Sequence, residues 1–503
     1  MRIVIIGSGF GGLATGVRLA AKGHEVTILE QRDQPGGRGY VYRQDGFTFD
    51  GGPTVITAPW MIEDLFTLAG RTPSDYVRLV PVDPFYRIFF PDGEYLDYSG
   101  DATRMEAEIR RLTGPAAEDE IAGYRCFVAM SERIFDKGFT ELADKPFLHV
   151  SDMAKVAPAL VQLQSYRTVY GLVSRYVQDE RLRQVLTFHP LLVGGNPFQT
   201  TSIYVLIHHL ERNWGVWFAL GGTGAVIDAL VRLFGELGGT LECNAPVETI
   251  LTTGRRATGV RLEDGRELAA DVVVSNADVA TTYTRLLKDH PRRWNADWRY
   301  ARMKYSMSLV VIYFGTDRQY RGTNGPELKH HDIILGPRYK GLLDDIFRRK
   351  TLADDFSLYL HCPTLTDPSL APPGCDAFYV LAPVPHLSGD TDWQTAARPY
   401  RDRIMRFLEE RYLPDLSRHL VTEHMIDPRH FQDTLGSYLG SAFSVEPVLT
   451  QSAWFRPHNR SQDVENLYFV GAGTHPGAGI PGVLSSAVIA DNLISALPGN
   501  HTH

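Results

Sequence analysis

The chain begins with a short run of apolar residues that predicts a buried β-strand. Ile3 to Ile6 are four successive apolar residues, and a second strand-like run extends from His24 to Leu29. Parallel strands that are covered on both faces show continuous apolar runs of this kind. The residues between the two runs are predicted to form a helix. Strand, helix and strand in this order indicate the first βαβ unit of a doubly wound α/β fold.

Between this unit and the next buried strand of the same type, the hydrophobic pattern alternates between helical and strand-like stretches. A helical stretch from Pro146 to Trp217 carries apolar residues at the 3.6-residue period, at Tyr166, Val169, Tyr170, Val173, Tyr176 and Val177. Buried strands return at Asp271 to Ala277. Other predicted strands are Tyr86 to Phe90, Glu94 to Tyr98, Thr240 to Asn244, Ala245 to Ile250, Ser308 to Phe314 and Phe378 to Ala382, with a hairpin formed by Gly259 to Leu262 and Glu267 to Ala269. Predicted helices begin near Arg104 and cover Ala225 to Leu237, Tyr400 to Tyr412 and Ser485 to Leu497.

Composition narrows the class of protein. With 503 residues, 44% of them hydrophobic and 22% charged, the chain has the composition of a globular protein, and its length suggests roughly three domains. The net charge of −8 argues against binding to nucleic acid. No apolar run approaches the ~18 residues of a spanning helix. Four scattered cysteines without a Cys-x-x-Cys pair indicate neither disulfides nor a metal site.

Glycines between the first strand and helix predict a dinucleotide site. Gly7 permits the tight turn, Gly9 removes a side chain where a pyrophosphate approaches, and Gly12 lets the helix pack on the strand. Helix N–H groups then face the pyrophosphate. Glu30, at the end of the second strand, can accept hydrogen bonds from ribose hydroxyls.

The next segment favours FAD over NAD. Gly36-Gly37-Arg38 brings backbone and a positive charge near the ligand, and it resembles the Gly-Gly-Arg element of amine-oxidase-type FAD proteins. The strand that ends at Asp50 is placed near the flavin ribityl chain by the same resemblance. The backbone of Val247 is expected to meet the adenine for the same reason.

A glycine-rich segment near the carboxyl end makes the resemblance specific. Leu467 to Val483 resembles the signature of bacterial and fungal phytoene desaturases, which are flavoproteins that dehydrogenate carotenoids. Leu192 to Phe198, Asn213 to Phe218, Pro383 to Leu387 and Ser441 to Arg460 also resemble the bacterial enzymes. The resemblance implies non-covalent FAD, with the segment that contains Gly471, Gly473, Gly482 and Val483 lying along the flavin.

The implied reaction is the desaturation of phytoene toward lycopene. Hydride transfer to the flavin and loss of a proton would introduce trans double bonds into phytoene and partly desaturated carotenes, and a quinone or oxygen would reoxidise the flavin. Asp152 is a candidate acid–base residue, although helix N-capping is the simpler interpretation. Glu446 and His475 are weaker candidates.

These predictions combine into a domain plan. Residues 1–75, 221–285 and 440–503 would form a Rossmann-like FAD-binding domain, and residues 76–140 and 286–439 a sheet-based substrate domain. Residues 141–220 would form a helical insertion that either covers the core or faces a membrane as a lid, with Lys155, Arg167 and Arg175 near lipid headgroups. No signal peptide opens the chain, so we expect a peripheral protein on the cytoplasmic side of the cell membrane.

Three other functions remain open at this point. A flavin-dependent carotenoid isomerase or oxygenase would share the motifs without net dehydrogenation or with a different product. A prenyl-lipid carrier similar to the Rab escort and dissociation-inhibitor proteins would share the architecture without flavin chemistry. An amine oxidase would share the nucleotide site, but the Leu467 to Val483 segment fits the carotenoid group better.

Overall fold

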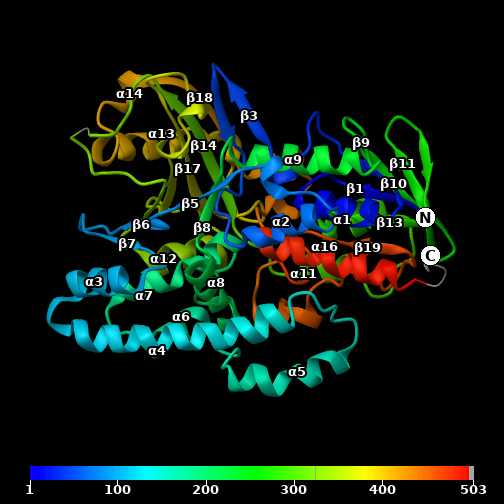
Figure 1. Ribbon diagram of the computed structural model, residues 1–503, viewed down its shortest axis with the longest axis horizontal. Coiled ribbons are helices and arrows are strands. Elements are labelled where there is room, and N and C mark those ends of the chain that lie inside the picture. The colour runs from blue at the N-terminus through cyan, green and yellow to red at the C-terminus, as the bar shows by residue number, and fades with distance from the viewer. Residues whose placement is uncertain (323, 498–503) are drawn as a thin grey trace.

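The computed structural model describes residues 1–322 and 324–497. Residues 498–503, the end of the predicted third FAD segment, lie outside the described residues, as does residue 323. The helices gather around two large β-sheets (Figure 1).

A five-stranded parallel sheet carries the first βαβ unit. Its strand order is β19 (Leu467–Phe469), β13 (Val272–Ser275), β1 (Arg2–Ile6), β2 (Glu25–Leu29) and β9 (Thr240–Glu242). Ile3 and Ile5 face α1 (Phe10–Ala21), α9 (Thr223–Glu236) and α16 (Ile480–Ser495). Val4 and Ile6 face the opposite side, toward the antiparallel sheet of β10 (Val247–Thr253), β11 (Arg256–Leu262) and β12 (Glu267–Ala269). Continuous apolar strands therefore reflect a sheet that is covered on both faces.

A seven-stranded sheet forms the second half of the molecule. Its order is β18 (Leu420–Ile426), β14 (Ser308–Thr316), β17 (Asp376–Val384), β16 (Leu358–His361), β15 (His331–Ile334), β6 (Tyr86–Phe89) and β7 (Tyr95–Tyr98). Val310, Ile312 and Phe314 pack under α13 (Trp393–Arg411) and α14 (Leu416–His419). Leu309, Val311 and Tyr313 alternate with them and lie on the other face, as the two-residue period of a strand requires.

Helices make a third layer below both sheets (Figure 1). This layer contains α3 (Ala102–Thr113), α4 (Ala117–Phe135), α5 (Val150–Gln162), α6 (Val169–Val173), α7 (Glu180–Thr187) and α8 (Leu206–Trp214). Two small sheets pair β3 (Val41–Gln44) with β4 (Phe47–Asp50) and β5 (Leu79–Val82) with β8 (Val216–Ala219). The other α-helices are α2 (Pro59–Thr67), α10 (Val279–Thr281), α11 (Asp297–Arg302), α12 (Tyr339–Asp344) and α15 (Pro428–Asp433). Because α4 packs on α8, helices on both sides of the predicted boundary at residue 141 share one layer. The domain boundaries themselves stay a prediction.

Most predicted strands and helices are present, with two notable differences. The helix predicted near Tyr400 begins at Trp393, because Asp392 caps it and Pro399 is accommodated inside it. The amphipathic helix predicted from Tyr166 to Val177 was wrong in length: α6 covers only Val169–Val173, and Thr168 caps its start. Its apolar residues Val169, Leu172 and Val173 are buried in the largest core cluster.

The close approach of α4 to the segment after α6 generates a stability prediction. A Cβ added at Gly123 would lie 1.8 Å from the backbone oxygen of Tyr176, so Gly123→Ala should force the helix outward and destabilise the protein by about 1–3 kcal/mol. Gly235, in α9, is the matched control because nothing lies within 4 Å of its added Cβ, and Gly235→Ala should stabilise by about 0.5–1 kcal/mol. Thermal melting midpoints should shift in opposite directions. A Gly123→Ala midpoint at or above that of the parent would contradict the close contact.

Candidate active site

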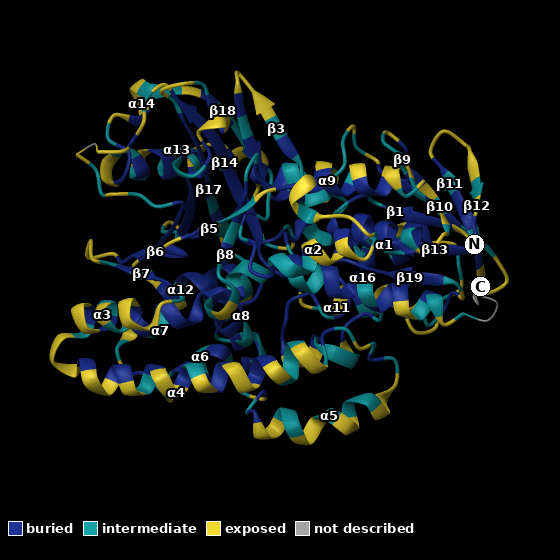
Figure 2. Ribbon diagram, viewed as in Figure 1, coloured by how far each residue is buried: buried dark blue, intermediate teal, exposed yellow. Residues whose placement is uncertain are grey.

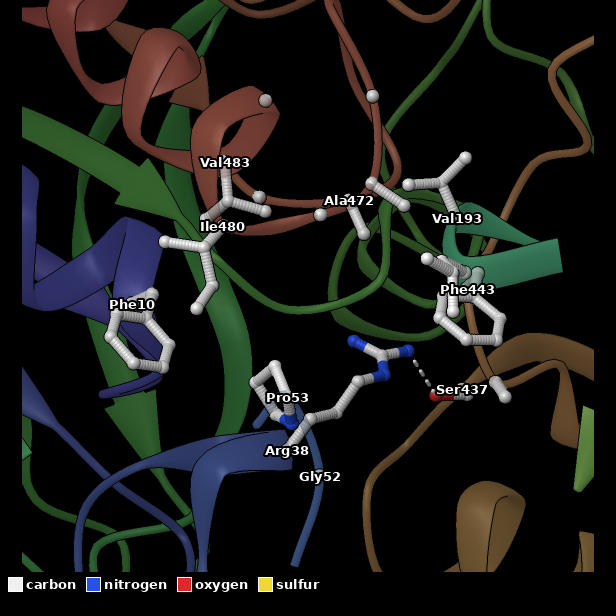
Figure 3. Close-up of a pocket in the computed structure, with 18 of the residues that line it drawn as sticks. Phe10, Arg38, Gly52, Pro53, Val193, Ser437, Phe443, Ala472, Ile480 and Val483 are labelled. Carbon is white, nitrogen blue, oxygen red and sulfur yellow. Dashed lines mark hydrogen bonds between the residues drawn. The ribbon is translucent and has the colours of Figure 1, made fainter. Parts of the chain in front are cut away.

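One large cavity lies where the two sheets and the helical layer meet. One end of it is lined by the glycine-rich segments around residues 7–11, 36–39, 51–54 and 471–483. The other end is lined by the inner face of the seven-stranded sheet and by α8 and α12. Figure 3 shows Phe10, Arg38, Pro53, Ala472, Ile480 and Val483 around the first end.

At the first end of the cavity, several backbone positions leave no room for a side chain. Gly7 has φ +93°, and a Cβ at Gly12 would lie 2.0 Å from the carbonyl oxygen of Gly7. Gly9 caps α1 and lines the cavity, so the first N–H groups of α1 start at its wall. Gly12 itself does not line the cavity and serves the packing of α1 on β1, as the sequence predicts.

Gly36, Gly37 and Arg38 lie directly beside this loop. The N–H of Gly36 donates to the carbonyl of Ser8 at 3.1 Å, and a Cβ at Gly37 would lie 3.2 Å from the Cα of Gly9. Arg38 Nη2 donates to Ser437 Oγ at 2.8 Å (Figure 3). Its Nε is buried without a partner, and burial lowers the pKa of Arg38 while Asp278 partly offsets this. An unsatisfied guanidinium nitrogen beside a glycine cradle fits an anionic or carbonyl-rich ligand such as a flavin nucleotide.

Glu30 ends β2 at the wall of the same cavity. Its carboxylate accepts the Ser8 N–H at 2.9 Å, the Ser8 hydroxyl at 2.6 Å and the Arg32 N–H at 3.0 Å. These bonds fix the carboxylate to the loop that follows β1. Glu30 therefore holds that loop in addition to any contact with a ribose.

Asp50 is buried beside the start of α9. It is absent from the cavity lining, and its Oδ1 accepts the N–H of Gly224 at 3.2 Å at the start of α9. Burial raises the pKa of Asp50 to about 6, against the opposing hydrogen bonds from Thr223 and Gly224. Asp50 thus acts on the helix terminus, while its neighbours Gly51 and Gly52 reach the cavity.

The carboxyl-terminal glycines close the opposite side of the cradle. Gly471 has φ +97°, and its N–H donates to Ser486 Oγ at 2.9 Å. Gly482 and Val483 line the cavity at the first turn of α16. Gly473 faces Ser444 and Val279 and does not line the cavity. Val247, at the start of β10, lines the cavity as well.

Sequence reasoning missed three residues that shape this end. Asn276 follows β13 and its Nδ2 donates to the Gly7 carbonyl at 3.4 Å. Asp278 caps α10 and accepts the Ser444 hydroxyl at 2.7 Å. Both follow a buried strand at the carboxyl edge of the sheet, which is the position that could have flagged them. Arg456 is buried and donates to the carbonyls of Ala472, Thr474 and Val445 at 2.7, 3.0 and 3.0 Å, so it holds the carboxyl-terminal loop in place.

The second end of the cavity is lined mainly by apolar side chains. These come from the inner faces of β14 and β17 (Leu309, Val311, Tyr313, Tyr379, Leu381), from the segments that follow α7 and precede α8 (Phe188, Leu191, Leu192, Val193, Ile203), and from α12 (Tyr339, Leu342, Leu343). Such a wall offers few hydrogen-bonding groups and suits a long hydrocarbon.

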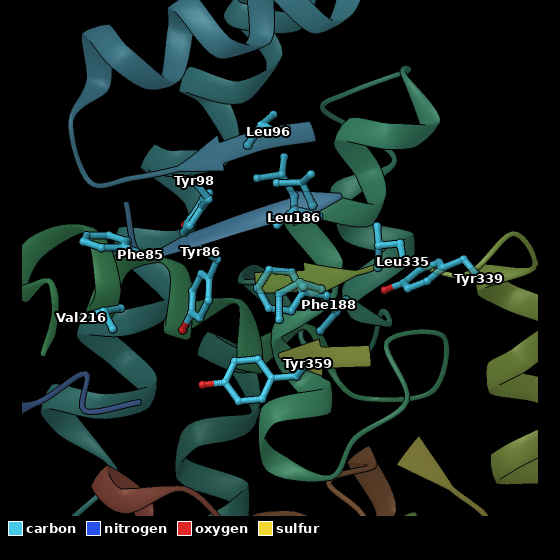
Figure 4. Close-up of a cluster of buried hydrophobic side chains, with 14 of the residues drawn as sticks. Phe85, Tyr86, Leu96, Tyr98, Leu186, Phe188, Val216, Leu335, Tyr339 and Tyr359 are labelled. Carbon is cyan, nitrogen blue, oxygen red and sulfur yellow. The ribbon is translucent and has the colours of Figure 1, made fainter. Parts of the chain in front are cut away.

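A buried polar group interrupts this apolar end. Glu211, on α8, lines the cavity and is fully buried. It accepts the Tyr86 hydroxyl at 2.8 Å, and its other oxygen lies 3.0 Å from His189 Nε2. Burial raises the pKa of Glu211 to about 7 and lowers that of His189 to about 3. Figure 4 shows Tyr86 within the surrounding cluster of aromatic and aliphatic side chains.

The candidate acid–base residues are not brought together. Asp152 lies in the first turn of α5, where its carboxylate accepts the His149 N–H at 3.0 Å, and it does not line the cavity. Glu446 is buried outside the lining, and burial raises its pKa to about 7. His475 lines the cavity, and burial lowers its pKa to about 3.

Comparison with known proteins identifies the family. Residues 10–492 match the family described as flavin containing amine oxidoreductase. The chain belongs to this family. The flavin in that description agrees with the glycine cradle and the unpaired Arg38 Nε.

Curated relatives and solved structures extend this result. The chain is 54% identical to a phytoene desaturase (lycopene-forming) from Pseudescherichia vulneris, over 98% of this chain and 99% of the relative. It is 52% identical to the protein of the same name from Pantoea ananas, over 97% and 98%. Among solved structures, cyclohexylamine oxidase from Brevibacterium oxydans matches with a TM-score of 0.62 at 16% identity, covering 98% of each chain. The fold is therefore the α/β fold of the flavin amine oxidases, as predicted.

The burial of Glu211 predicts a specific pH dependence of stability. With a folded pKa near 7 against an ordinary value of 4.5, the folded state binds this proton more tightly than the unfolded state. The contribution of Glu211 to stability is therefore fully present below pH 4.5 and is lost as the pH rises from 4.5 to about 7. Glu211→Gln should remove up to about 3 kcal/mol of that loss.

Melting midpoints of parent and variant across this pH range would measure the effect. Glu410→Gln, at an exposed position of α13, is the control and should leave the pH profile unchanged. Asp50 and Glu446 keep their own share of the pH dependence in the Glu211 variant. Identical profiles for parent and Glu211→Gln would contradict a buried, titrating Glu211.

Proposed function

We propose that the protein desaturates phytoene toward lycopene, using FAD as the hydride acceptor and forming trans double bonds. The single observation that carries the proposal is one continuous cavity that joins a glycine cradle to a long apolar wall. The two lycopene-forming relatives at more than half identity over the whole chain support the same substrate class. Partly desaturated carotenes would bind the same wall as successive substrates.

The residues that would hold FAD form one continuous surface. Gly7, Gly9 and the start of α1 would face the pyrophosphate, with Gly12 keeping α1 close. Glu30 would reach the ribose and Val247 the adenine, while Gly36, Gly37 and Arg38 would border the opposite side. Gly471, Gly482 and Val483 would lie along the flavin. When bound, the flavin supplies the two-electron acceptor of the reaction.

The chain's own contribution is positioning and exclusion of water. The inner faces of β14 and β17 align an extended hydrocarbon, and the buried walls exclude water from the reacting carbons. Removal of a hydride next to the conjugated triene of phytoene is feasible because the positive charge that develops is spread over the polyene. The carboxylate of Asp152 accepts the His149 N–H at the start of α5 and does not line the cavity, so Asp152 is not among the proposed catalytic groups.

We also propose that the protein docks peripherally on a membrane, where a quinone or oxygen reoxidises the flavin. None of the helices that the structure describes has the length and apolar character needed to cross a bilayer. The surface that we propose for docking is α5 with the neighbouring residues 449–455. Val150 and Val161 on α5 are 65% and 63% exposed, and Leu449 and Phe455 are also exposed. In Figure 2, α5 lies at the edge of the molecule and has no buried residue.

We propose that this surface borders the entrance to the cavity. Met153 and Leu160 of α5 line the cavity, as do Leu449 and Ala453 on the segment against which α5 packs. Within the predicted Tyr166 to Val177 face of the helical insertion, Val169, Val173 and Val177 are packed in the core, whereas Tyr166 is 57% exposed. A substrate dissolved in lipid would therefore enter beside α5.

Anaerobic reaction with phytoene tests the proposed chemistry. Adding phytoene in liposomes to the yellow protein should bleach the flavin and yield carotenes with two hydrogens fewer per step and a longer chromophore. Arg38→Met should hold less flavin and bleach in proportion. The cofactor released by heat should have the mass of FAD.

The alternatives give different results in the same experiment. An isomerase would change the absorption spectrum of the carotene at constant molecular formula. A colourless protein that binds phytoene without converting it would indicate a carrier. Unchanged flavin absorbance with intact phytoene would overturn the proposal.

Liposome co-sedimentation tests the docking surface. Replacing Val150 and Val161 by aspartate puts two charges on the exposed face of α5 and should weaken binding by about tenfold or more, because two apolar side chains would be lost from the interface. Val421→Asp is the matched control, since Val421 is 50% exposed on β18. Equal binding by the α5 variant and the parent would exclude α5 as the docking surface.

A further inference from the structure

Three histidine side chains form a buried cluster at the edge of the cavity wall. His331 and His361 are directly opposed partners of the antiparallel strands β15 and β16, so their side chains share a face. His330 immediately precedes β15, and its ring folds onto the same pair. The ring centroids lie 4.4 Å apart for His330 and His331, 4.8 Å for His330 and His361, and 5.1 Å for His331 and His361.

The cluster is sealed from solvent but its polar atoms are not all satisfied. His330 is 5% exposed, and the other two histidines are fully buried. The Nε2 atom of each of the three rings is buried without a hydrogen-bond partner. Burying a polar atom without a hydrogen-bond partner destabilises the folded state by about 1–3 kcal/mol. Three such atoms in one cluster are therefore expected to contact a bound ion or water.

The other ring nitrogen of each histidine is anchored. His330 Nδ1 lies 2.6 Å from Thr366 Oγ1, and His331 Nδ1 lies 2.6 Å from the Tyr359 hydroxyl. His361 Nδ1 lies 3.2 Å from the carbonyl oxygen of His330 and 3.3 Å from His331 Nδ1. Anchoring of one nitrogen by a hydroxyl or carbonyl is how proteins orient imidazoles that bind a metal through the other.

The spacing of the three rings also suits a cation. One nitrogen from each ring lies within 4.8 Å of the others. Nitrogens on one tetrahedral zinc stand about 3.3–3.4 Å apart, as bonds of about 2.0–2.1 Å require. The rings would move toward one another on binding the ion.

We propose that His330, His331 and His361 bind a divalent transition-metal ion, zinc by preference, enclosed between β15 and β16. Three imidazoles suit zinc, whereas calcium and magnesium need oxygen ligands, and the described residues add no carboxylate or thiolate to the group. The spacing of the cysteines predicts no metal site, but it carries no information about histidines that the pairing of two strands brings together. This proposal does not depend on the proposed desaturation.

The ion would have a structural role next to the cavity. Tyr359 lines the cavity and lies 3.1 Å from Thr54 Oγ1 as well as 2.6 Å from His331. Fixing His331 therefore fixes a side chain of the substrate wall. The ion would tie together two strands that bring Tyr359 to the cavity.

Elemental analysis of the flavin-loaded full chain tests the site. We expect about one zinc per chain in protein expressed with zinc and dialysed against chelator, and a spectrum of tetrahedral nitrogen-bound cobalt when cobalt replaces it. X-ray absorption at the zinc edge should show nitrogen scatterers at about 2.0 Å with the multiple scattering of imidazole. Less than a tenth of an equivalent of every transition metal, also after refolding with zinc, would overturn the proposal and leave water as the occupant.

Variants separate this site from adventitious histidines elsewhere. His361→Asn should lose the bound metal, whereas His424→Asn should retain it, because His424 also has a buried Nε2 without a partner but stands apart from the cluster. Retention of a full equivalent by a folded His361→Asn protein would overturn the proposal. If that variant does not fold, the metal content and absorption spectrum of the parent decide the question alone.

Discussion

The start of α1 packs on the end of β1 so closely that a Cβ at residue 12 would lie 2.0 Å from the carbonyl oxygen of Gly7. Two distant segments crowd the same place, since a Cβ at Gly11 would lie 2.6 Å from the side chain of Asn276 and 3.1 Å from the backbone nitrogen of Gly471. Residues near positions 11, 276 and 471 thus meet at one point. The close approach brings α1 together with the segments that follow β13 and β19 at one end of the parallel sheet, where Gly9 and Gly11 line the cavity.

Beyond this contact, the alternation of side chains along each strand determines which residues line the apolar end of the cavity. In β14 and β17, every second side chain packs under α13 and the others form the apolar wall. An apolar wall solvates charged groups poorly, and burial accordingly raises the pKa of Glu211 to about 7 and lowers that of His189 to about 3. Both shifts favour the uncharged form of the group. That state suits a hydrocarbon ligand, because unpaired charges beside it would be costly.

Features set by residues that are close in the sequence could be predicted, whereas features that depend on which strands pair could not. The βαβ unit, its glycines and the hairpin at Asp264 and Gly265 are local patterns, and all are present. The helix from Tyr166 to Val177 was wrong because residues such as Val177 are buried by tertiary contacts beyond the short helix α6. Asp50 was assigned to the cofactor by resemblance, and nothing in the sequence indicated that its carboxylate accepts the Gly224 N–H at the start of α9. His331 and His361 are 30 residues apart, and only the register of β15 and β16 makes them neighbours.

The helical layer shows the same principle at the scale of a surface. A 3.6-residue apolar period identifies one face of a helix that is buried, but it cannot say whether protein or lipid covers that face. For α6, the covering is the core, in which Val169, Leu172 and Val173 are fully enclosed. For α5, no residue is buried by protein, although Met153 and Leu160 reach the cavity. Helix α5 thus differs from α6 in presenting Val150 and Val161 to the surface, which is the arrangement that the proposed passage of a hydrocarbon from lipid would use.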